Sequence, residues 1–230
     1  MSHVTPRQYP LLIAATLALG VALAGCATPE TRPAAERHVS AAQTTLNNFK
    51  SDPNMTWLRN NLKNAHAVII SSSVTRGAFI VGGSGGEAVV LARDVKRGRW
   101  IGPAFYKLGE GSLGLQAGVD VSEVVVLVMT EKARDALLSS SFKLGGDASI
   151  AAGPVGTGAS SSVTTDLVAF ARSKGIYAGL SLEGAVIRPD NEANAAFYGR
   201  DVSPLDILVR GSADNPAAAP LQQSLRADAR

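Results

Sequence analysis

The stretch GAFIVGGSGGEAVVL, residues 77–91, decides the fold class. It joins a glycine-rich segment to a run of apolar and β-branched residues, and 19 of the 23 glycines in the chain lie between Gly77 and Gly184. Similar apolar runs occur at residues 68–70 and 124–128. Short β-branched runs separated by glycine are typical of antiparallel strands. The sequence therefore predicts an α+β protein: a glycine-rich antiparallel β-sheet or barrel-like core with N-terminal helices and a few short peripheral helices.

The segment before this core predicts two helices. Residues 34–50 are moderately apolar, and Asp52 followed by Pro53 is a typical helix start. A stripe at helical spacing follows, with Trp57 beside it: Met55, Leu58, Leu62 and Ala65. Two interpretations stay open, since such a stripe either packs into the core or forms an amphipathic face on lipid with Trp57 at the interface.

Further elements are predicted after the glycine-rich segment. Residues 93–100 indicate a basic hairpin turning near residues 96–98, and residues 174–175 a turn between strands at 164–173 and 176–187. Helices are expected at residues 131–139 and 191–198, the first after Thr130 as its cap.

The N-terminus has the pattern of a secretory signal. A basic head precedes an apolar run at residues 11–24, which is shorter than the roughly 20 residues that a membrane-spanning helix needs. Cys26, the only cysteine, follows small residues, and this arrangement resembles a bacterial lipoprotein signal. The resemblance implies cleavage before Cys26 and acylation of its thiol and new amino group by palmitate-type chains. The alternative is a plain signal peptide with an incidental buried cysteine.

These features divide the chain into four parts. Residues 1–25 are expected to be the lipoprotein signal peptide, residues 26–37 a lipidated tether, residues 38–210 the folded domain with its N-terminal helices, and residues 211–230 a disordered tail. The formal net charge of +3 permits contact with anionic lipid but does not predict nucleic-acid binding.

Two motifs resemble catalytic sequences but lack the context that catalysis needs. Residues 82–86 fit the G-x-S-x-G pattern of a nucleophile elbow, yet no histidine follows His66 to complete a triad. Residues 109–114 fit G-x-G-x-x-G without a helix after them. We interpret both as glycine turns or kinks between strands. His38 and His66 are expected to be surface or capping residues, and we predict no enzyme activity, no metal site and no cofactor.

The stretch from about residue 64 to residue 211 resembles the SYLF domain family (Ysc84-type). The resemblance depends on six blocks that occur in the family's order: residues 77–85, Trp100 with Pro103, residues 114–118, residues 146–156, residues 174–184 and residues 194–208. The sequence departs from the family at Ile101 and Ala171, where a serine and a tyrosine are usual.

The resemblance implies a lipid-binding module, so we expect a phospholipid membrane as the partner. The alternative is an envelope scaffold that binds another envelope protein without recognising a lipid headgroup. Because Ala27 rather than aspartate follows Cys26, we expect anchoring in a bacterial outer membrane, facing the periplasm or the cell surface. The expected lipid contacts are cations near the anchor with one tryptophan, and a second patch on the basic hairpin: Arg37, Trp57, Arg59 and Lys63, and then Arg93, Lys96, Arg97 and Arg99.

Overall fold

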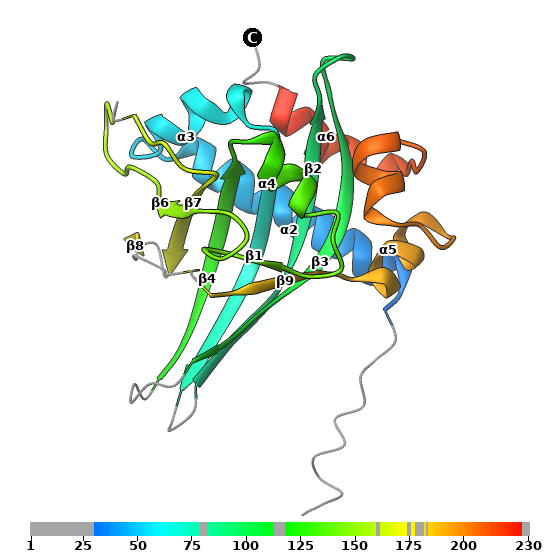
Figure 1. Ribbon diagram of the computed structural model, residues 1–230, viewed down its shortest axis with the longest axis horizontal. Helices are drawn as coiled ribbons and strands as arrows, with labels where there is room; N and C mark the ends of the chain where they lie inside the picture. Colours follow the sequence, from blue (N-terminus) through cyan, green and yellow to red (C-terminus); the bar gives the residue numbers. More distant parts are fainter. Residues whose placement is uncertain are drawn as a thin grey trace, which may run out of the picture.

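A computed structural model describes residues 30–78, 82–112, 118–159, 162–173, 176–177, 182 and 184–226 (Figure 1). The strands are β1 (Ala67–Ala78), β2 (Gly82–Asp94), β3 (Arg99–Ser112), β4 (Gly118–Val128), β5 (Phe142–Lys143), β6 (Ile150–Ala152), β7 (Leu167–Ser173), β8 (Ile176–Tyr177) and β9 (Val186–Pro189). The helices and helical turns are α2 (Arg32–Ser51), α3 (Thr56–Asn61), η1 (Leu62–Asn64), α4 (Glu131–Ala136), α5 (Asn191–Tyr198), η2 (Asp206–Arg210), η3 (Pro216–Ala218) and α6 (Ala219–Arg226).

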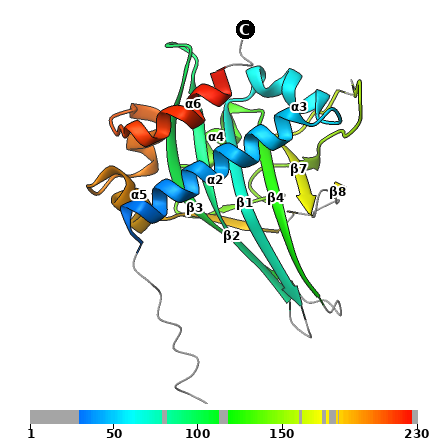
Figure 2. The same ribbon diagram turned by 180° about the vertical axis from the view of Figure 1, so that it is seen from behind.

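The strands form one curled sheet in the order β5-β9-β3-β2-β1-β4-β7-β6, with β8 paired to β7. Strands β1 to β4 are long and antiparallel, and β6 pairs with β7 in parallel. Figure 2 shows α2 crossing one face of the sheet, with α3, α5 and α6 on the same side. The predicted α+β fold with an antiparallel, partly closed sheet is confirmed.

Both faces of the sheet are buried. In β1, Val68 and Ile70 belong to the apolar cluster under the helices, whereas Ala67 and Ile69 belong to the cluster on the other face. Buried side chains on alternate faces explain why these strands are continuous apolar runs rather than alternating ones. The second face is covered by α4, η2 and the segments between β4 and β9.

Local signals account for the helix starts. Thr31 accepts a hydrogen bond from the backbone N–H of Ala34 at the start of α2, and Thr130 and Asp190 do the same for α4 and α5. Gly199 ends α5 with φ +71°, the left-handed conformation that glycine adopts readily. The predicted helix at residues 191–198 is confirmed at both ends, and the hairpin turn near residues 96–98 is confirmed between paired Asp94 and Arg99.

The predicted boundaries of the domain are wrong at both ends. Helix α2 begins at Arg32, so residues 32–37 are helix rather than tether. The tail predicted as disordered contains η3 and α6, whose Ala218, Leu221 and Leu225 are buried in the cluster that also holds α2. Two leucines four residues apart are a weak signal alone, and the apolar surface of α2 supplies the packing that makes this helix stable.

Three smaller predictions also change. The second helix is short, because α3 gives way to η1 at Leu62. The strand predicted at 176–187 is two elements: β8 pairs with β7, whereas β9 lies across the sheet between β3 and β5. Residues 82–86 and 109–112 are not turns, since they lie within β2 and β3. The predicted turn at residues 174–175 lies outside the described residues.

Strand conformation at residues 82–86 also removes the nucleophile elbow, because that motif needs a sharp turn from a strand into a helix. Gly86 has a different role. It lies opposite an irregularity in the pairing of β1 with β2, and a Cβ at Gly86 would lie 2.6 Å from the backbone oxygen of Ser73. The close approach of two backbones therefore requires glycine at this position.

Candidate functional site

A hollow with a cavity volume of about 600 Å³ lies beside the turn of the β2–β3 hairpin. The hairpin turn, the start of α4 and the turn η2 form its walls. The lining residues are Arg93, Asp94, Val95, Lys96, Arg97, Ile101, Glu131, Arg134, Leu208, Val209 and Arg210. We call this surface the basic hollow.

Positive charge predominates in the basic hollow, with five cations and two carboxylates among the lining side chains. Three of the arginines pair with carboxylates: Arg97 with Asp94 at 3.0 Å, Arg134 with Asp135 at 2.7 Å and Arg210 with Asp206 at 2.6 Å. Each of these pairs has at least one exposed partner, and exposed pairs contribute only about 0–1 kcal/mol. An incoming anionic group could therefore exchange with these carboxylates at little cost.

Apolar side chains stand among these cations. Val95 at the hairpin turn is 62% exposed and Val209 in η2 is 49% exposed. Exposed valines next to arginine and lysine give the hollow both an apolar and a cationic character, which is the combination found on surfaces that bind the headgroup region of a membrane.

The carboxylate of Asp206 organises η2 at the edge of the hollow. It accepts hydrogen bonds from the Ser203 hydroxyl at 2.6 Å, from the Ser203 backbone N–H at 3.1 Å and from Arg210 at 2.6 Å. The hydrogen bond from the Ser203 side chain, followed by that from Arg210, lowers the pKa of Asp206 to about 2.

This lowered pKa predicts a loss of stability in acid. A carboxylate with a folded-state pKa below its unfolded value stabilises the fold fully above pH ~4, and this contribution disappears as the pH falls toward 2. We therefore expect the difference in free energy of unfolding between the unmodified chain and Asp206→Asn to shrink between pH 4 and pH 2. Chemical denaturation at a series of pH values measures it, and a constant difference across this range would contradict the assignment.

The structure places three of the four cations of the predicted hairpin patch in the hollow. Arg93, Lys96 and Arg97 line it. Arg99 does not, and its buried Nε has no hydrogen-bond partner among the described residues. Arg93 also donates to the backbone carbonyl of Lys63, so the exposed Lys63 lies next to this patch.

The other predicted patch is not brought together as one surface. Arg37 is exposed in the first half of α2, whereas the guanidinium of Arg59 donates to backbone carbonyls at the end of α2, including that of Lys50 at 3.1 Å. The expectation of an interfacial tryptophan is wrong for this conformation: Trp57 is 5% exposed and packs against Phe170, with ring centroids 6.0 Å apart. Of the two interpretations of this helix, the core packing holds.

Sequence reasoning missed Arg134, Val209 and Arg210, which complete the hollow. No local pattern connects them with the hairpin, because α4 and η2 reach it only through the fold. Cys26 and the predicted signal peptide lie outside the described residues. Among the residues that the structure describes, none of the helices combines the length and apolar character needed to cross a bilayer.

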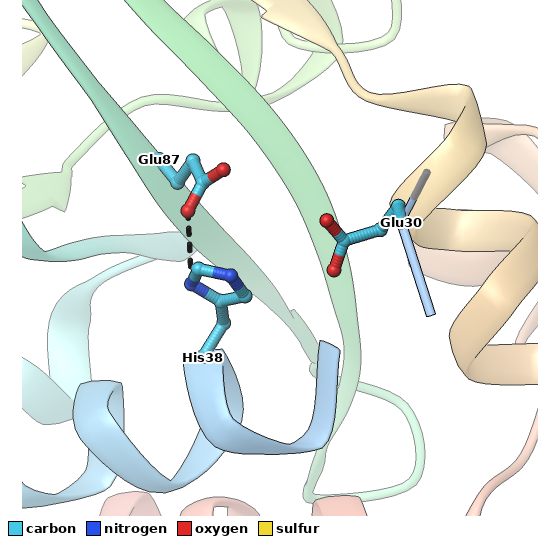
Figure 3. Close-up of side chains that lie close together, drawn as sticks. All are labelled: Glu30, His38 and Glu87. Carbon is cyan, nitrogen blue, oxygen red and sulfur yellow. Dashed lines mark ion pairs between the residues drawn. The ribbon is translucent and has the colours of Figure 1, made fainter. Parts of the chain in front are cut away.

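A second group of polar side chains lies near the N-terminal end of α2 (Figure 3). His38 in α2 and Glu87 in β2 form a close pair, with 3.0 Å between Nδ1 and Oε2. The carboxylate of Glu30, just before α2, points toward this pair. The expectation that His38 is a simple surface or capping residue is therefore incomplete, because the fold gives it two carboxylate neighbours.

The curled glycine-rich sheet, with helices packed on both faces, defines the class of protein: a single α+β domain built on a partly closed, mainly antiparallel sheet. The chain belongs to the Ysc84 (SYLF) family, because the family model described as "Las17-binding protein actin regulator" matches residues 109–228. The family resemblance inferred from the glycine blocks is confirmed.

Relatives in animals and yeast agree with this assignment. SH3 domain-containing YSC84-like protein 1 of Rattus norvegicus is 32% identical over 152 residues, which cover 64% of this chain and 44% of the relative. Protein YSC84 of Saccharomyces cerevisiae is 32% identical over 175 residues, covering 73% and 37%. LAS seventeen-binding protein 3 of the same yeast is 31% identical over 178 residues, covering 73% and 38%. The chain thus spans less than half the length of these relatives.

Proposed function

We propose that this protein is a membrane-anchored lipoprotein whose SYLF domain binds anionic phospholipid through the basic hollow. The observation that carries the proposal is the hollow itself, which five cations line together with exposed Val95 and Val209. Each lysine or arginine close to an anionic surface contributes about 1 kcal/mol, and the valines add apolar contact at the acyl boundary. The domain works by binding, with no catalytic step.

Anchor and hollow are separate contacts in this proposal. Acylated Cys26 supplies the anchor, and the six residue steps from Cys26 to Arg32 reach at most about 20 Å. In both views the β2–β3 turn projects at the top of the molecule, and the start of α2 lies well below it beside α5 (Figures 1 and 2). The hollow therefore determines the orientation of the domain and its headgroup preference, or contacts a second membrane, while the acyl chains hold the protein in the outer membrane.

Liposome flotation of a chain beginning at Ala27 tests this proposal without the acyl anchor. We expect binding to anionic vesicles that weakens as salt rises, because exposed charges are screened. Reversing two hollow cations, Lys96→Glu with Arg97→Glu, removes at least about 2 kcal/mol of attraction and should weaken binding about 30-fold.

The matched control reverses two exposed cations outside the hollow, Lys143→Glu with Arg188→Glu. It changes the net charge equally, so it should weaken binding much less if the hollow is the binding surface. If both variants weakened vesicle binding equally, binding would depend on the net charge of the domain and not on the hollow. If the parent chain did not bind anionic vesicles at low salt, the proposal of lipid binding would be wrong.

The relatives' names favour a second candidate function. The family model is described as a Las17-binding protein and actin regulator, and one relative is named LAS seventeen-binding protein 3. Both names refer to protein binding. A bacterial member could accordingly bind an envelope protein through the same exposed hollow. If the Lys96→Glu, Arg97→Glu variant kept vesicle binding but lost capture of a specific envelope protein, the scaffold function would replace the lipid-binding one.

A further inference from the structure

The group formed by Glu30, His38 and Glu87 has the composition of a metal site. One ligand atom from each residue lies within 4.8 Å of the others. The three residues come from different parts of the fold, namely the segment before α2, the second turn of α2 and strand β2. One imidazole with two carboxylates is a set of borderline and hard donors that suits a divalent transition metal.

The state of the Glu30 carboxylate is the second observation. Its Oε1 is buried and has no hydrogen-bond partner among the residues that the structure describes. A buried carboxylate oxygen without a donor is costly, because it loses its hydration and gains nothing in exchange. A cation beside His38 and Glu87 would supply the missing interaction.

The same three side chains line a small cavity at the base of α2. Glu30, His38 and Glu87 line a cavity of about 10 Å³, which is about the volume that one water-sized particle requires. Asp190 also lines this cavity, but its carboxylate is 2.9 Å from the ammonium of Lys107, so it is already neutralised.

We propose that Glu30, His38 and Glu87 bind one divalent transition metal ion, with Zn²⁺ the best match to the donors. Zinc takes nitrogen and oxygen ligands at about 2.0–2.2 Å, so modest rotation of the two glutamate side chains brings all three donors into range. The two carboxylates neutralise the ion, and water fills the fourth position.

The bound ion cross-links the segment before α2 to strand β2 of the sheet. Glu30 lies four residues after Cys26, and Glu87 lies in a central strand. The metal therefore restricts the rotation of the domain about its N-terminal segment, whatever the hollow binds. This makes the site independent of phospholipid recognition.

Equilibrium dialysis of the full chain against Zn²⁺, followed by metal analysis, tests the proposal. A Cys26→Ser background removes the thiol as a competing ligand. We expect one Zn²⁺ per chain, and His38→Asn and Glu30→Gln should each weaken binding by at least about tenfold, the scale seen when even the outer contacts of metal sites are lost. Zn²⁺ should also raise the Tm of the parent chain but not that of His38→Asn.

His66→Asn is the matched control, because Nδ1 of His66 is 4.0 Å from the Glu131 carboxylate in a similar histidine–carboxylate pair. It should leave Zn²⁺ binding unchanged. Glu30 lies outside the helices and strands, so Glu30→Gln tests the site without disturbing the fold. Zn²⁺ binding that is absent, or equal in the parent, His38→Asn and Glu30→Gln chains, would overturn the proposal.

Discussion

Asn194→Ala is expected to lower the free energy of unfolding by about 3 kcal/mol. Asn194 is fully buried in α5, and its side chain pairs with the backbone of Phe105 like a short piece of strand. Its Oδ1 accepts from the Phe105 N–H at 2.9 Å, and its Nδ2 donates to the Phe105 carbonyl at 3.2 Å. Strand β9 pairs with β3 only from Tyr106 to Gly109. Asn194 therefore provides hydrogen-bond partners for the backbone of β3 at Phe105, just beyond the end of β9.

Asn194→Ala lowers stability mainly because the buried backbone N–H of Phe105 would lose its hydrogen-bond acceptor. The Phe105 carbonyl keeps a second donor, because the backbone N–H of Asp190 donates to it at 2.9 Å. An unsatisfied buried donor costs about 1–3 kcal/mol, and the lost amide leaves a cavity as well.

Urea unfolding of a chain beginning at Ala27 measures the effect. Asn47, which is exposed on α2, provides the matched control, and Asn47→Ala should change stability by no more than about 0.5 kcal/mol. If Asn194→Ala were as stable as Asn47→Ala, the Phe105 pairing would have no importance for the fold.

Gly153→Ala is expected to cost about 3 kcal/mol, at the upper end of the range for overpacking. An ideal Cβ on Gly153 would lie 2.1 Å from the Phe170 ring. The backbone cannot move away easily, because the Gly153 N–H donates to the Ala169 carbonyl at 2.8 Å. The ring is equally confined, since Phe170 is 1% exposed and packs against Trp57.

A double-mutant cycle identifies the clash as the cause. Phe170→Leu shortens the side chain, so Gly153→Ala should cost at least about 1 kcal/mol less in that background than in the parent chain. Gly109→Ala is the control, because a Cβ on Gly109 meets nothing within 4 Å. Equal costs of Gly153→Ala in the two backgrounds would show that the ring is not responsible.

Gly153 and Asn194 show what two of the sequence blocks shared with the family contribute to the structure. Gly153 lies in the block at residues 146–156 and Asn194 in the block at residues 194–208. The first allows a loop to lie on an aromatic ring, and the second replaces a missing strand neighbour. In the sequence, both residues were only members of blocks shared with the family. Their contacts in the structure explain why glycine and asparagine are needed at these positions.

Elements with local causes were predictable from residues close together in the chain. The β-branched runs and glycines indicated the antiparallel sheet, and Thr130 was predicted as the cap at the start of α4. Caps, turns and short-range periodicity depend on neighbours within a few positions, so one sequence is enough to recognise them.

Contacts between distant segments were not predictable in this way. The basic hollow joins the β2–β3 turn to η2, more than a hundred residues later, and the cavity beside His38 joins α2 to β2. Helix α6 is stable because it packs on α2, and β9 pairs with β3 although Tyr106 and Pro189 are far apart in the sequence. The free energy of these contacts comes from burial and charge that exist only after the sheet has curled, and no local pattern in the chain encodes them.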